Sequence, residues 1–306
     1  MNPTILDRIA LETPLISDGA TGTYLQAHGL EPGGCPEELN SSRPDLVSGM
    51  ALEYFDAGSE MVLTNSFGGS RFMLKKYGYG NRVNELNTLA AQNARVVAPS
   101  GKYVVGSVGP TGEFLEPLGE VSAEEMRDVF GEQMSALKEG GADAFMVETM
   151  TSIEEAVIAI EAAHRDADIP VMISMTFDKG PRGYFTMMGV SPERAVRELR
   201  DAGADVVGAN CGNGIDKMVE LAVEILSAGG GHTAIHSNAG MPQIHNGRIV
   251  YPETPEFMSS RFRNLADMGV RVIGGCCGTT PAHVKFLSEI INGTTGLGLT
   301  SAKGGT

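Results

Sequence analysis

The sequence predicts an α/β fold, a single-domain (β/α)8 TIM barrel, from three observations. Short apolar runs rich in β-branched residues recur along the 306 residues. A stretch with helical periodicity follows each of them. Eight such units occur, which is the number that closes a parallel barrel, and this fold commonly takes about 250 residues or more in one domain. The alternative is a doubly wound open sheet, which needs fewer strands or a reversal of the strand order.

The predicted strands are short and evenly distributed. They cover residues 14–18, 60–65, 103–109, 144–148, 171–177, 205–210, 233–238 and 270–275. Strands that alternate with helices pair in parallel and are buried on both faces. We therefore expect a barrel over residues 1–291, followed by a flexible Gly- and Thr-rich tail over residues 292–306.

Helix starts between the strands carry their own signals. Ser122 precedes Glu125 in a capping-box pattern, and Ser191 and Thr280 each precede a proline. Several of the predicted helices end at a glycine directly before the next strand, which is the usual way for a helix to stop. These signals place eight helices on the outside of the predicted barrel.

Composition excludes several classes of function. The chain has 23 Lys and Arg against 38 Asp and Glu, a formal charge of −15, so we expect no binding to nucleic acid or to an anionic membrane. The first fifteen residues contain Asp7, Arg8 and Glu12 and do not form a signal peptide. No apolar run approaches the 18 or so residues of a membrane span. We expect a cytoplasmic protein whose cysteines remain reduced.

Polar side chains and thiols follow most of the predicted strands. In a barrel the active site forms at the C-terminal ends of the strands, so these residues should lie around one mouth. They are Asp18, Asn65, Glu148, Asn210, Cys211, Asn238, Cys276 and Cys277.

Three of the four cysteines fall on two of these strand ends. Cys211 follows the sixth strand, and Cys276 and Cys277 follow the eighth. Three thiolates with an open fourth position are typical of a catalytic zinc site, because a structural site has four protein ligands. The alternative is that the adjacent pair is core packing in a glycine-rich turn, since cysteine is among the most buried residue types.

The loop after the first strand suits an anion. Asp18, Gly19, Ala20 and Thr21 form a turn whose small side chains expose backbone N–H groups. Polar groups at other strand ends, Glu148 and Asn238 among them, could hold an ammonium group together with Asp18. The alternative is a tight turn beside ordinary polar residues of a barrel rim.

Nine short motifs, in this order, resemble the homocysteine S-methyltransferase family over about residues 14–290. Within the family the likeness is greatest to the homocysteine-binding module of cobalamin-dependent methionine synthase. The motifs are DGATGT at 18–23, PEELN at 36–40, LTNSFG at 63–68, GSVGPTG at 106–112, ET at 148–149, MTF at 175–177, GANCG at 208–212, NAG at 238–240 and GGCCGTTP at 274–281.

The resemblance implies a zinc-dependent methyltransferase that methylates the thiol of homocysteine to give methionine. It implies that Cys211, Cys276 and Cys277 bind one Zn²⁺ per chain. It also implies that the loop from Asp18 holds the substrate carboxylate, and that Glu148 and Asn238 recognise the amino group. Zn²⁺ with three thiolates carries −1, and a fourth thiolate makes the centre −2, so the excess charge keeps the bound sulfur nucleophilic.

The methyl donor is left open by the sequence. The cobalamin motif Asp-x-His-x-x-Gly does not occur, so we expect methylcobalamin to be supplied by a partner corrinoid protein acting in trans. One alternative is a small donor, S-methylmethionine or betaine, used directly. A second is a non-catalytic barrel subunit that docks a corrinoid protein. Two features depart from the family pattern: His236 and Ser237 precede Asn238 where a proline is expected, and the loop at 178–189 is unusually apolar.

Overall fold

The chain forms a nearly closed barrel of eight parallel strands, which confirms the predicted fold. The computed structural model describes residues 3–229, 231–245 and 248–293. The strands follow the order β1-β12-β9-β8-β5-β4-β3-β2, which is chain order around the ring once two small hairpins are set aside. The barrel strands are β1 (Leu15–Ile16), β2 (Met61–Leu63), β3 (Tyr103–Val108), β4 (Ala144–Met150), β5 (Val171–Met175), β8 (Val206–Cys211), β9 (His232–Ser237) and β12 (Val272–Gly275).

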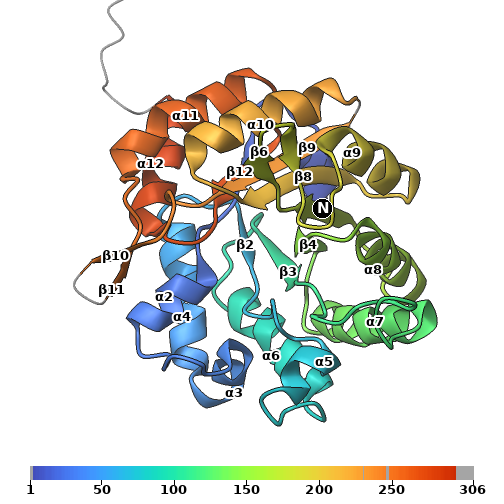
Figure 1. Ribbon diagram of the computed structural model, residues 1–306. Helices are drawn as coiled ribbons and strands as arrows, with labels where there is room; N and C mark the ends of the chain where they lie inside the picture. The colour runs from blue at the N-terminus through green and yellow to red at the C-terminus, as the bar shows by residue number, and fades with distance from the viewer. Residues whose placement is uncertain (1–2, 230, 246–247, 294–306) are drawn as a thin grey trace, which may run out of the picture.

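Helices surround this ring of strands (Figure 1). The longer ones are α4 (Pro44–Asp56), α6 (Val83–Arg95), α7 (Ala123–Glu139), α8 (Ile153–Asp166), α9 (Pro192–Asp201), α10 (Ile215–Ser227), α11 (Pro255–Asp267) and α12 (Pro281–Asn292). The shorter ones are α1 (Ile5–Ile9), α2 (Thr21–Ala27), the 3₁₀ turn η1 (Pro36–Glu38), α3 (Leu39–Ser42) and α5 (Arg71–Lys75).

The predicted helix starts are confirmed at α7, α9 and α12. The Ser122 and Ser191 side chains accept hydrogen bonds from the N–H groups of Glu125 and Arg194, and Thr280 is the N-cap of α12. These bonds satisfy N–H groups that have no partner within the helix. Helix α12 continues to Asn292, one residue past the predicted domain end, and residues 294–306 of the predicted tail lie outside the described residues.

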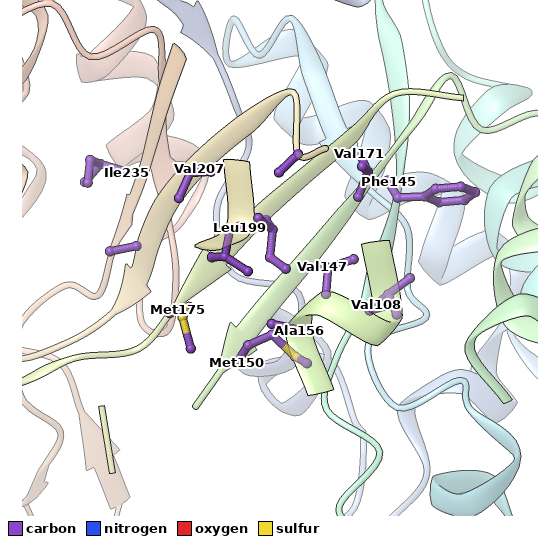
Figure 2. Packing of buried hydrophobic residues seen from close by; sticks show 14 of the residues in the cluster. Val108, Phe145, Val147, Met150, Ala156, Val171, Met175, Leu199, Val207 and Ile235 are labelled. Carbon is purple, nitrogen blue, oxygen red and sulfur yellow. The ribbon is translucent and has the colours of Figure 1, made fainter. Parts of the chain in front are cut away.

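The core has two main parts and a small third cluster around Leu74 and Leu86. The larger part lies between the outer faces of the strands and the helices, where Val147 and Val207 meet helix residues such as Ala156 and Leu199 (Figure 2). The smaller part fills the barrel interior, and Ile5 and Ile9 of α1 pack against it. Helix α1 therefore plugs the end of the barrel opposite the mouth.

The barrel interior changes from apolar to polar towards the mouth. Val105, Met146, Met172 and Ala234 belong to the interior core. Because strand side chains alternate with a period of two, the residues two positions later point to the same interior. Those residues are Ser107, Glu148, Ser174 and His236. Burial lowers the pKa of His236 to about 4, so this imidazole is neutral at pH 7.

Side chains complete the junction between β1 and β2, where the described residues form no regular ladder. One backbone bond links Glu60 N–H to Ile16 O at 2.7 Å. The Asp18 carboxyl accepts from Leu63 N–H at 2.7 Å, and the Glu60 carboxylate accepts from Ile16 N–H at 3.3 Å. Two acidic side chains thus replace strand-to-strand hydrogen bonds at the seam of the barrel.

Two antiparallel hairpins were not predicted, because each strand is only three residues long. One comprises β6 (Asp178–Gly180) and β7 (Gly183–Phe185), after β5. The other comprises β10 (Gln243–His245) and β11 (Arg248–Val250), after β9, and projects beyond the ring of helices (Figure 1). Among the described residues, no helix has the length and apolarity that a membrane span requires.

Replacing Asp18 by Asn should change how stability depends on pH. Burial raises the pKa of Asp18 to about 8, whereas in the unfolded chain it returns to its usual value near 4. The folded chain therefore holds a proton that the unfolded chain releases, and the resulting stability is complete below about pH 4 and is lost as the pH rises through about 8. We expect wild type to lose stability relative to Asp18→Asn between pH 5 and pH 8.5.

Urea unfolding of wild type and Asp18→Asn at each pH gives the difference between their free energies of unfolding. The contributions of the other titrating groups cancel in this difference. Parallel stability curves would contradict the buried, protonated Asp18. Asp18→Ala should be destabilised by about 1–3 kcal/mol at pH 6, because the Leu63 N–H then has no acceptor.

Candidate functional site

Three cysteine sulfurs converge at the mouth of the barrel. The sulfurs of Cys211, Cys276 and Cys277 all lie within 4.8 Å of one another, and those of Cys211 and Cys276 are 3.2 Å apart. A zinc ion with Zn–S bonds of about 2.3 Å needs sulfurs roughly 3.8 Å apart. The three thiols are soft donors at suitable separations, so the residues present fit a zinc ion.

Strand register brings the three cysteines together. Strand β9 lies between β8 and β12, and its Ser237 pairs with Cys211 on one side and with Gly275 on the other. Cys276 N–H donates to Ser237 O at 2.7 Å. Cys211 itself has a φ of 63°, a left-handed conformation that is unusual for a residue with a side chain. The cluster therefore forms where β8 and β12 both end against β9.

Hydrogen bonds among the three thiols shift the pKa values of Cys277 and Cys276 in opposite directions. Hydrogen bonds from the Cys211 and Cys276 thiols lower the pKa of Cys277. Hydrogen bonds with Cys211 and Cys277, together with burial, raise the pKa of Cys276 well above its usual value. Ionising all three sulfurs needs a neighbouring cation, which a divalent metal supplies.

Asn210 connects the sulfurs to two neighbouring strands. Its Nδ2 lies 3.5 Å from Cys211 Sγ and 3.9 Å from Cys276 Sγ, and it donates to Thr149 Oγ1 at 2.7 Å. Its Oδ1 accepts from Thr149 N–H at 2.8 Å and from Ser174 Oγ at 2.7 Å. The fully buried Asn210 holds Thr149, whose φ is also 63°, and donates towards two sulfurs.

A cavity of about 290 Å³ opens beside the sulfurs. Its walls come from the ends of six barrel strands and from the turn around Pro36. The lining residues are Gly19, Ala20, Thr21, Gly22, Pro36, Glu37, Leu63, Thr64, Asn65, Phe67, Ser107, Glu148, Thr149, Cys211, Gly275, Cys276 and Cys277. The cavity therefore contains all three predicted metal ligands and four of the six predicted substrate contacts.

Glu148 lines the cavity together with the three cysteines. Burial, helped by the negative charge of Cys277, raises the pKa of Glu148 to about 7, although a hydrogen bond from Ser107 Oγ at 2.5 Å acts to lower it. A carboxyl with this pKa gains or loses its proton near neutral pH. Glu148 can therefore accept a hydrogen bond from a cationic amino group and respond to its charge.

The predicted loop residues Gly19, Ala20 and Thr21 line the cavity at the start of α2. Ala20, the N-cap of α2, makes no side-chain capping bond. The N–H groups in the first turn of a helix have no partner within the helix. Ala20 N–H donates to Thr279 Oγ1 at 3.1 Å, so the N–H groups further into the turn are the ones suited to an anion.

Asp18 and Asn238 lie behind the cavity wall. Asp18 is buried at the barrel seam, where it accepts from Leu63 N–H and from Ser17 Oγ at 3.1 Å. Asn238 donates from Nδ2 to Gly212 O at 3.0 Å, and its buried Oδ1 has no partner among the described residues. Their direct contact with a substrate therefore stays a prediction.

Glu37 and Phe67 are among the residues of the cavity wall to which the sequence assigned no role. Glu37 is buried, accepts from Gly68 N–H at 2.7 Å and from the Cys35 thiol, and has a pKa raised by burial. Phe67 lines the cavity and is partly exposed. Glu37 belongs to the PEELN motif at 36–40, which contributed only to the family resemblance. The motif does not lie at the end of a predicted strand, so the strand-end argument did not select Glu37.

The fold and the cavity together define a (β/α)8-barrel enzyme with its reactive groups at the C-terminal ends of the strands. The chain belongs to the homocysteine S-methyltransferase family, whose family model matches residues 15–291. This confirms the family that the sequence motifs indicated.

Curated relatives of this chain are considerably longer than it is. It is 32% identical over 297 residues to methionine synthase of Mycobacterium tuberculosis and, with the same figures, to that of Mycobacterium leprae. Each alignment covers 90% of this chain and 24% of the relative, so the chain spans about a quarter of their length.

A solved structure with the same fold is the metallated form of the homocysteine methyltransferase MmuM from Escherichia coli. The TM-score is 0.75 at 21% identity, and the match covers 90% of this chain and 96% of that one. At this identity the likeness shows the fold, and it agrees with the barrel described above.

Asn210→Ala should destabilise the chain by about 2–4 kcal/mol, because Thr149 N–H and Ser174 Oγ lose their buried acceptor. Urea unfolding of the metal-free chain measures this loss. The matched control is Asn292→Ala, which removes an amide with one exposed bond to Ser288 and should change stability by less than about 0.5 kcal/mol. Equal stability of the two variants would argue against the network around Asn210.

Proposed function

We propose that this chain is a zinc-dependent methyltransferase that converts homocysteine to methionine, with a methyl-corrinoid protein acting in trans as donor. The observation that carries the proposal is the group of three cysteine sulfurs on the wall of a cavity that also contains Glu148. Membership of the homocysteine S-methyltransferase family supports the acceptor. The name of the mycobacterial relatives, methionine synthase, supports the product.

In this proposal Cys211, Cys276 and Cys277 hold the zinc ion and leave one position for the substrate thiol. Bound zinc lowers the pKa of that thiol, so the sulfur is present as a nucleophilic thiolate at neutral pH. The protein supplies orientation: the N–H groups of the loop that begins at Asp18 bind the substrate carboxylate. Glu148 and Asn238, together with Asp18, recognise the amino group.

Exposed apolar side chains around the mouth support a macromolecular donor. Phe114 and Leu118 follow β3, Met187 follows β7, and Ile244 lies in β10, with exposed fractions between 59% and 83%. Apolar groups gathered on the loops around a cavity are typical of a surface that another protein or domain covers. A small donor would need no such surface.

The cytoplasmic location and the absence of nucleic-acid binding stay predictions.

Replacing a metal ligand should remove both metal and activity. Cys276→Ala leaves two sulfurs, too few for a tetrahedral site, and should lose bound zinc and turnover while keeping the barrel folded. Metal analysis after anaerobic preparation should find about one zinc per chain in wild type. The control is Cys35→Ala, a buried cysteine outside the cluster, which should keep its zinc. Turnover retained by Cys276→Ala would refute the metal role.

The methyl donor can be tested without altering the chain. Purified protein with homocysteine should form methionine when methylcobalamin is supplied, free or on a corrinoid protein. It should form none above background with S-methylmethionine or betaine alone. Methionine is measured by mass spectrometry. Fast turnover with either small donor would overturn the corrinoid assignment and leave the acceptor and the metal site standing.

A further inference from the structure

Ser107 of β3 is a buried hydroxyl residue in the cavity wall, and the proposed function gives it no role. It is 3% exposed and lines the cavity together with Glu148. Strand β3 pairs directly with β4, the strand that carries Glu148. Ser107 therefore lies where a small change in its position would reach the group proposed to recognise the substrate.

Strand β2 ends too early to pair with Ser107. Its last residue, Leu63, stands opposite Val105 of β3, and Thr64 N–H donates to Val105 O at 2.9 Å. Ser107 lies two residues further along β3, where β2 offers no backbone partner. Its buried N–H and carbonyl therefore need partners from the loop that follows β2.

Two hydroxyls of that loop close a ring of hydrogen bonds around the Ser107 backbone. Thr64 Oγ1 accepts from Ser107 N–H at 3.0 Å, and Ser66 Oγ donates to Ser107 O at 2.7 Å. The two hydroxyl oxygens are 2.6 Å apart. Because a hydroxyl has one proton and that of Ser66 is already used, the Thr64 hydroxyl donates to Ser66 Oγ. The ring thus satisfies both backbone groups of Ser107.

Ser66 is itself held by two helices outside the barrel. Its carbonyl accepts from Gln133 Nε2 of α7 at 2.7 Å and from Gly69 N–H at 2.9 Å. Gly69 O accepts from Asn87 Nδ2 of α6 at 2.8 Å, and a Cβ atom on Gly69 would overlap Asn87 Oδ1. Both amide side chains are buried. The ring is therefore anchored to α6 and α7, which fixes the position of Ser107.

The Ser107 hydroxyl is free to act on Glu148, because the ring uses only the backbone of Ser107. It donates to Glu148 Oε1 at 2.5 Å. Glu148 Oε2 makes no hydrogen bond to another residue in the described part of the chain, and the side chain lines the cavity. The terminal torsion of glutamate is soft, so a bond that holds one oxygen also restrains the other. Oε2 is thus left for a ligand in the cavity.

We propose that Ser107 is a positioning residue that aims the Glu148 carboxyl at the amino group of the substrate. This inference rests on the proposed function. An ammonium group binds a carboxylate oxygen through charge-assisted hydrogen bonds, and a carboxyl that is already oriented loses less freedom on binding. Without the Ser107 hydroxyl the Glu148 side chain can turn away. The site then distinguishes homocysteine less well from a thiol that lacks the amino group.

Binding of two related thiols tests this role. Homocysteine and 4-mercaptobutanoate share the thiol, the chain length and the carboxylate, and only homocysteine has the amino group. Ser107→Ala should bind homocysteine about tenfold more weakly than wild type, the scale expected for loss of a hydrogen bond to a charged group. It should bind 4-mercaptobutanoate as well as wild type does. Isothermal titration calorimetry of the zinc-loaded chains measures both affinities.

The matched control is Ser259→Ala. The Ser259 hydroxyl is buried and donates to Glu256 O at 2.7 Å on α11, so its loss should change neither affinity. Equal losses for the two thiols in Ser107→Ala, or no loss for homocysteine, would overturn this inference alone. A wild-type chain that binds neither thiol would overturn the proposed function and this inference with it.

A double variant separates positioning from a general loosening of the cavity wall. In a Glu148→Leu background, Ser107→Ala should weaken homocysteine binding by less than about twofold, because the carboxyl through which Ser107 acts is already gone. A further tenfold loss in the double variant would overturn the proposal.

Ser66→Ala tests the same arrangement if Ser107→Ala does not fold. It keeps the Ser107 hydroxyl and removes the donor to the Ser107 carbonyl. Homocysteine affinity should then fall about threefold, with no change for 4-mercaptobutanoate. Unchanged homocysteine affinity in a folded Ser66→Ala chain would count against the proposal as decisively.

Discussion

The structure depends on holding three sulfur atoms, each able to carry a negative charge, within 4.8 Å of one another. Like charges at this distance repel strongly in a partly buried site. Without a cation the chain limits the repulsion by sharing thiol hydrogen bonds among the three sulfurs. Asn210 Nδ2 lies 3.5 Å from Cys211 Sγ and adds a donor from the protein. The same proximity of the sulfurs suits the cluster to a divalent metal ion, whose charge would offset the repulsion.

The barrel supplies the rigid frame that this cluster needs. Its interior is apolar near α1, where hydrophobic burial fixes the strands. Near the mouth the interior is polar, so the layer of side chains at the C-terminal strand ends is available for chemistry. The left-handed backbone at Thr149 and Cys211 shows the cost of aiming side chains into one cavity. Asn210 offsets that cost at Thr149 by bonding both its N–H and its hydroxyl.

The buried acidic residues Asp18 and Glu148 differ in their position relative to the cavity. Asp18 stands at the barrel seam and substitutes for a strand hydrogen bond, whereas Glu148 lines the cavity. Both have pKa values raised by burial. A raised pKa by itself therefore does not distinguish a carboxyl of the candidate site from a structural one, and the position relative to the cavity decides.

The sequence by itself determined the eight strands, the helix starts at Ser122, Ser191 and Thr280, and the three cysteines of the cluster. These features are local, because periodicity, capping residues and strand ends depend on residues that are close together in the sequence. Only the tertiary structure decided that Asp18 closes the barrel, that Glu37 lines the cavity and that Tyr251 packs on the turn at Gly278. Each of these residues contacts a segment distant in the chain, through strand register and helix packing that no local pattern encodes.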